Sequence, residues 1–183
     1  MMTISEVMIL SLVFLFQMAC KKEVNDKTGT GFVLTSMAIG ADSLLPADYT
    51  CQGSSSTLPL HWTGAPSGTV SFVLIMHHEA SPTDIHCYWI LYNIPADVDI
   101  LPRNVTGIGT FGINSVNDKM QYTPPCSQGP GLRDYILTLY ALSQKPVIDL
   151  APDSVDRPAM LNAIKDITIS STKMTVYYVW NKK

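Results

Sequence analysis

Apolar and polar side chains alternate in several short stretches of the chain, which is the pattern of half-buried β-strands. The first such stretch covers residues 32–37, and Gly/Pro/Ser-rich turns separate it from the later ones. Further strands are predicted at 58–62, 70–76, 88–94, 135–142 and 172–180. Many short strands joined by turns favour a β-sandwich.

One stretch near the C-terminus has the pattern of a helix. Ser154 or Asp156 can cap it, Pro158 suits its first turn, and apolar residues follow at helical spacing. Residues 95–134 are long and irregular, and loops of that length in a compact domain are usually functional. We therefore predict an all-β dominated fold, a two-sheet antiparallel Greek-key β-sandwich with one or two short C-terminal helices.

The N-terminus differs from the rest of the chain. Residues 8–19 are almost entirely apolar, which is too short to cross a bilayer but suits the core of a signal peptide. Small Ala19 precedes Cys20, an arrangement that resembles a bacterial lipoprotein signal. The alternative is an ordinary cleaved signal peptide. We predict a signal peptide at 1–19, a lipidated Cys20 with a polar tether at 20–30, and one domain at 31–183.

This organisation implies an exported protein, held in the cell envelope by a lipid anchor and facing the periplasm or the cell surface. The formal net charge is −3 and no basic run occurs, so nucleic acid is not an expected partner. Hydrophobic residues make up 46% of the chain, which is enough for a substantial core.

With Cys20 lipidated, an odd number of cysteines remains, so at most one disulfide forms within the domain. Cys51 and Cys126 lie in turn-rich loops, where a covalent link stabilises most. Cys87 lies in an apolar strand, where a free thiol behaves as a small hydrophobe. We predict a Cys51–Cys126 disulfide and a buried free Cys87.

Six motifs in a fixed order give the chain a family resemblance. They are YTCQG at 49–53, LPLHW at 58–62, SFVLIMHH at 71–78, WILYNIP at 89–95, GTFGIN at 109–114, and PPC at 124–126 before YILTLYAL at 135–142. In this order they resemble the phosphatidylethanolamine-binding protein family, including its bacterial branch, over roughly residues 31–180. The resemblance implies two packed sheets with a small end pocket for anionic groups such as a phospholipid head-group phosphate.

The chain departs from the family at the pocket itself. His78 stands where the family has the aspartate of its DPDAP motif, followed by Glu79. Tyr88 replaces the histidine of the HW motif, with His86 two residues earlier, and Arg133 replaces the histidine of the HRY motif. These positions remain polar, but their chemistry changes, so the family's ligand does not transfer directly.

The altered residues still suggest an anion pocket. Arg133 offers a planar fork of donors, tyrosine hydroxyls add donors, and the Pro/Gly-rich loop can present backbone N–H groups. An alternative role for Arg133 is an ion pair with Asp134 or another surface carboxylate. The predicted ligand-binding residues are His78, Glu79, His86, Tyr88, Tyr122, Pro125 and Arg133.

Two other functions stay open at this point. Some animal and plant relatives bind kinases or transcription complexes, so the chain could be a protein-interaction module. A metal-dependent hydrolase would need His78, Glu79 and His86 to converge, although their spacing matches no familiar zinc pattern. No motif of a known catalytic class occurs, so we predict no catalytic residue, no metal and no cofactor.

Overall fold

The computed structural model describes residues 31–180. The predicted signal peptide, Cys20 and the tether lie outside these residues. Within them, the structure contains no helix with the length and apolar character needed to cross a membrane.

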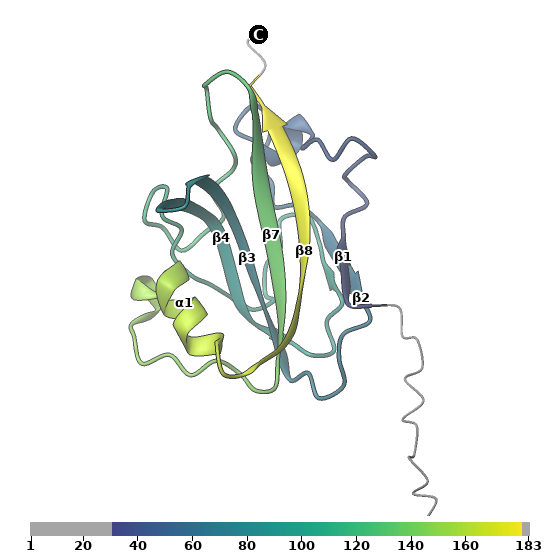
Figure 1. Cartoon of the computed structure of the whole chain (residues 1–183), viewed down its shortest axis with the longest axis vertical. Coiled ribbons are helices and arrows are strands. Elements are labelled where there is room, and N and C mark those ends of the chain that lie inside the picture. Colours follow the sequence, from purple (N-terminus) through teal and green to yellow (C-terminus); the bar gives the residue numbers. More distant parts are fainter. Residues whose placement is uncertain (1–30, 181–183) are drawn as a thin grey trace, which may run out of the picture.

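Two antiparallel sheets form the domain (Figure 1). The small sheet has the order β1-β2-β5, formed by Val33–Thr35, Leu60–Thr63 and Ile100–Leu101. The large sheet has the order β6-β4-β3-β7-β8, formed by Thr110–Phe111, Asp84–Pro95, Ser71–Ser81, Leu132–Leu142 and Thr168–Val179. The predicted two-sheet antiparallel sandwich is confirmed.

The main core lies between the two sheets. Alternate residues of β3 face it, and aromatic rings meet there across the sheets, with Trp62 and Phe72 centred 5.3 Å apart at an angle of 65°. Burial of these large rings is a dominant favourable term for folding. The sandwich is therefore held together by the side-chain alternation that the sequence shows.

A second core lies on the opposite face of the large sheet, under helix α1 (Arg157–Ile164). Met160 and Ile164 of the helix are buried against Val73 and Ile75 of β3. Asp156 caps the helix by accepting a hydrogen bond from the backbone N–H of Ala159 at 2.8 Å. Figure 1 shows the helix lying across this face, with β1 and β2 behind the sheet. Two single-turn 3₁₀ helices occur at Ala47–Tyr49 and Pro152–Ser154.

The hairpin of β3 and β4 is longer than the sequence pattern indicated. Its strands continue through residues 77–87 and are joined by a tight turn after the pair Ser81↔Asp84. His78 and His86 are directly opposed across the two strands. The hairpin thus carries its histidines to the end of the sheet, where the candidate site lies.

Candidate functional site

A cavity of about 380 Å³ opens at the end of the large sheet. It lies between the β3–β4 hairpin, the start of β7 and the loop that precedes β7. Its lining residues are His78, Ala80, His86, Tyr88, Val116, Thr123, Pro124, Cys126, Ser127 and Arg133. Volumes of this size are typical of small-molecule sites.

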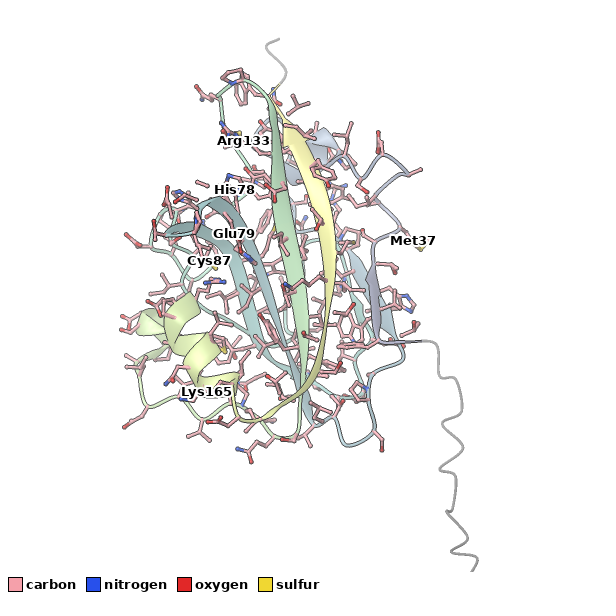
Figure 2. All side chains as sticks on the ribbon, in the orientation of Figure 1. Met37, His78, Glu79, Cys87, Arg133 and Lys165 are labelled. Atoms are coloured by element: carbon pink, nitrogen blue, oxygen red, sulfur yellow. A yellow bond between two sulfur atoms is a disulfide. The ribbon has the colours of Figure 1, made fainter. Side chains whose placement is uncertain are left out.

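Three neighbouring strands supply the polar wall. His78 comes from β3, His86 and Tyr88 from β4, and Arg133 from the start of β7. Figure 2 shows Arg133 and His78 at the same end of the sheet, with Cys87 nearer to helix α1. Four of the seven residues predicted to bind ligand therefore lie together on one cavity.

Arg133 has no carboxylate within ion-pair distance in the part of the chain that the structure describes. Asp134, which sequence analysis offered as its partner, pairs instead with His78 at 3.4 Å. The guanidinium lies against the loop at Gly129, where an added Cβ would stand 3.2 Å from Arg133 Nη2. A glycine at this position therefore lets the arginine rest close to the loop backbone.

Both cavity histidines are anchored from outside the cavity. His78 Nδ1 donates to the carbonyl oxygen of Asp134 at 2.7 Å, and its side chain is only 12% exposed. His86 Nε2 lies 3.1 Å from Asp84 Oδ1, and its side chain is 43% exposed. The bond from Nδ1 to the Asp134 carbonyl fixes the orientation of the His78 ring.

An aromatic cluster forms the floor of the site. The rings of Tyr88 and Tyr135 meet edge to face with centroids 5.0 Å apart, and His78 lies 5.4 Å from Tyr135. Burial raises the pKa of both tyrosines, so both hydroxyls stay protonated donors. The Tyr135 hydroxyl is fully buried without a hydrogen bond of good geometry, and the Tyr88 hydroxyl is its polar neighbour.

The loop before β7 is fixed from several sides. Cys126 forms a disulfide with Cys51, and the backbone N–H of Cys51 donates to the Pro125 carbonyl at 3.1 Å. The backbone N–H of Thr123 donates to the Tyr88 carbonyl at 2.9 Å. The predicted disulfide is therefore present, and one of its cysteines lines the cavity. Cys87 is free and buried, as predicted.

A single buried asparagine shapes the preceding turn. Asn114 is fully buried, and its Nδ2 donates to the carbonyls of Lys119 and Gln121 and to Asn117 Oδ1. Its Oδ1 accepts from the backbone N–H groups of Val116 and Asn117 at 3.0 Å. This network holds Val116 against the cavity.

Three predicted ligand residues lie elsewhere. Glu79 faces the opposite side of β3 from His78, because adjacent strand residues point in opposite directions. There it accepts a hydrogen bond from His77 Nε2 at 3.1 Å. Tyr122 points into the core and donates its hydroxyl to the Tyr49 carbonyl at 2.7 Å. Pro125 is buried, and its neighbours Pro124 and Cys126 face the cavity instead.

Sequence reasoning missed Thr123 and Ser127. Thr123 is 8% exposed, lines the cavity, and its hydroxyl has no protein partner. The signal was its place beside Tyr122, because a side chain directed into the core leaves its extended neighbour directed outward.

No carboxylate lines the cavity itself, although Asp134 and Asp84 lie beside His78 and His86. Among its lining residues are no Asp and no Glu, while Arg133, two histidines and three hydroxyls can donate or become donors. Within residues 31–180, no three His, Cys, Asp or Glu side chains are grouped to hold a metal ion. The convergence that a metal-dependent hydrolase required is absent there, because Glu79 faces away from His78 and His86.

Fold and cavity together define a class: two-sheet β-sandwich proteins with a ligand-sized cavity at one end of the larger sheet. The sequence profile described as Phosphatidylethanolamine-binding protein matches residues 35–179. The chain belongs to the phosphatidylethanolamine-binding protein family.

Individual relatives agree with this assignment. A UPF0098 protein of Methanothermobacter thermautotrophicus is 32% identical over 139 residues, which cover 73% of this chain and 89% of that protein. The crystal structure of a phosphatidylethanolamine-binding protein homologue from Chlamydia trachomatis superimposes with a TM-score of 0.72 at 25% identity, covering 84% of this chain and 99% of that one. Escherichia coli YbcL shares the fold, with a TM-score of 0.73 at 21% identity, covering 82% of this chain and 99% of that one.

Proposed function

We propose that this chain is a binding protein, not an enzyme, and that its cavity takes a small anionic ligand of the phosphate or phospholipid head-group type. The observation that carries this proposal is Arg133, which lines a cavity without carboxylates and has no ion-pair partner among the described residues. A guanidinium left without an anion is poorly compensated once water is displaced around it. A ligand oxyanion supplies the missing partner.

The surrounding donors suit a tetrahedral oxyanion better than a neutral molecule. Charge-assisted bonds from an arginine fork are about twice as strong as neutral hydrogen bonds. The hydroxyls of Tyr88, Thr123 and Ser127 add donors around the same space. The imidazoles of His78 and His86 line the same space.

The test is a thermal-shift panel on residues 21–183 with phosphate, sulfate, phosphoethanolamine, acetate, and zinc with and without a chelator. A ligand present at about a hundred times its dissociation constant adds about 2.7 kcal/mol to the free energy of unfolding. We expect stabilisation by phosphate or phosphoethanolamine that disappears in Arg133→Gln. Arg157→Gln is the matched control, because Arg157 lies outside this cavity and also lacks an ion-pair partner in the described part of the chain.

Other results would point to the other functions. A panel in which no anion stabilises the wild type would reject the anion site and leave the protein-interaction module as the better hypothesis. Stabilisation by zinc alone, reversed by a chelator, would favour the metal-dependent hydrolase. Equal loss in Arg133→Gln and Arg157→Gln would mean that anions act on the surface charge generally.

We also propose that the domain is tethered to a membrane through lipid on Cys20, which supports a role at the cell envelope. The apolar run before Cys20 and the polar residues after it support this tether. In a bacterial host, the wild-type chain should incorporate a radiolabelled fatty acid and partition into detergent, whereas Cys20→Ser should do neither. A wild-type chain that appears cleaved and without lipid would instead identify an ordinary signal peptide.

A further inference from the structure

A second cavity, of about 390 Å³, lies on the other face of the β3–β4 hairpin. It is bounded by the start of β4, by the turn that Asn114 organises, and by the start of helix α1. Its lining residues are Thr83, Ile85, Cys87, Ile113, Ser115, Asp118, Asp156, Arg157 and Pro158. None of them lines the first cavity.

The two cavities lie back to back across one strand. His86 and Tyr88 of β4 face the first cavity, and Ile85 and Cys87 face the second, because successive strand residues project to opposite sides. The backbone N–H of Cys87 donates to Ser115 Oγ at 2.8 Å, which ties the strand to the turn. The second cavity is thus formed by rigid elements and not by a loose surface loop.

Arg157 is the unexplained residue of this cavity. Its Nε atom is buried and has no hydrogen-bond partner, and no carboxylate within residues 31–180 lies within ion-pair distance of its guanidinium. A guanidinium that lines a cavity without an anion beside it favours an anionic partner from outside the chain. A carboxylate matches the guanidinium fork in shape and charge.

The same cavity also contains negative charge. Asp118 and Asp156 line it, and neither forms an ion pair among the described residues. One carboxylate oxygen of Asp156 caps the helix. Its other oxygen and both oxygens of Asp118 can accept a hydrogen bond from a ligand. Counting one arginine and two aspartates, the lining is net negative by one charge.

Apolar groups complete the lining. Ile85, Ile113 and Pro158 contribute hydrocarbon surface. Cys87 is a neutral thiol here, since burial raises its pKa to about 12. The cavity therefore offers a cationic fork, two anionic groups and an apolar wall within one small volume.

We infer that this second cavity binds a small zwitterion of the amino-acid type. The ligand carboxylate pairs with Arg157, its ammonium group pairs with Asp118 or Asp156, and a short apolar side chain contacts Ile85 and Ile113. A simple anion would pair with Arg157 but meet two aspartates, and a simple cation would leave the Arg157 guanidinium without an anion. Only a ligand with both charges satisfies both groups.

Isothermal titration of residues 21–183 with three matched probes tests this inference. L-leucine has both charged groups, leucinamide lacks the carboxylate, and N-acetyl-leucine lacks the ammonium. We expect saturable binding of L-leucine and about tenfold or greater weakening for each of the other two, since each loses one charge-assisted pair. Arg157→Gln should weaken L-leucine binding to the same degree, and Asp118→Asn should weaken it without disturbing helix α1.

The control variant is Arg133→Gln, which removes the cation of the first cavity and should leave L-leucine binding unchanged. Loss of L-leucine binding in Arg133→Gln, with none in Arg157→Gln, would overturn the inference. So would equal binding of all three probes, or no binding of any of them up to about 10 mM. Because the anion panel and this titration depend on different arginines, either result stands if the other fails.

Discussion

Arg133 and Arg157 share an unusual property, although they lie in different cavities. Each is a guanidinium that lines a cavity and has no ion-pair partner within the described chain. Arg103 shows the contrast, because it pairs with Asp48 at 3.1 Å and donates to Ser54 and Ser56. The domain therefore contains a fully paired arginine, and the two unpaired ones are the residues on which the two binding proposals rest.

A buried histidine, His77, gives a prediction about pH. Burial lowers the pKa of His77 below its ordinary value of 6.5, although the bond to Glu79 opposes this shift. As pH falls below about 6.5, His77 becomes protonated in the unfolded chain but stays neutral in the folded chain. The folded state therefore loses stability relative to the unfolded state. His77→Gln should flatten this acid-side loss in melting temperature, measured between neutral and mildly acidic pH.

Glu79→Gln tests the sign of the same effect. Removing the negative charge beside His77 should lower its folded pKa further, and the acid-side loss should become steeper. If His77→Gln and wild type lose stability in parallel, another group controls the acid behaviour.

At the level of elements, the alternation of side chains along a strand limited how well the sequence could predict the site, because it determines which residues face the cavity. The sandwich, the helix and the disulfide follow from alternation, capping residues and cysteine placement, and all three are present. The structure brings His78, His86, Tyr88 and Arg133 together on one cavity. Glu79, Tyr122 and Pro125 lie outside the cavity lining, because each stands next to a residue that lines it and points the other way.

The sequence alone could not show which strand residues face the cavity, because strand register also depends on β-bulges. Met76 pairs with Trp89, but His77 pairs with Cys87, so Tyr88 is an extra residue in β4. Such a bulge changes which side chains face each side of the sheet, and it depends on the pairing of two strands together. The second cavity could not be predicted from the sequence either, because its charged residues come from segments far apart in the chain.

The start of helix α1 supplies the prediction at this scale. Asp156→Ala removes the cap that accepts from the Ala159 N–H, and should cost about 1 kcal/mol of unfolding free energy. Asp153→Ala is the matched control, because Asp153 also precedes the helix but does not cap it. Urea denaturation of both variants measures the difference. Equal losses would mean that surface charge, not the cap, is responsible.

At the level of the whole molecule, one covalent link closes a long segment of chain. Cys51 and Cys126 are 75 residues apart, and β2 to β6 lie between them. Closing a loop of that length removes much unfolded-state entropy, and the bond should contribute about 4 kcal/mol.

The double variant Cys51→Ser/Cys126→Ser should therefore lose about that free energy in chemical denaturation, and reduction of the wild type should give the same loss. Cys87→Ala is the control, because it removes the free thiol and leaves the disulfide intact, so it separates any effect of the thiol from that of the bond. A reduced wild type as stable as the oxidised protein would show that the link adds nothing to the fold.

The bond also connects the fold to the first cavity. Cys126 lines that cavity, so the disulfide fixes one part of its wall to the loop at Cys51. Under the proposed function, anion binding would therefore increase when the Cys51–Cys126 bond forms, so oxidation of the chain and its affinity for a ligand would be linked.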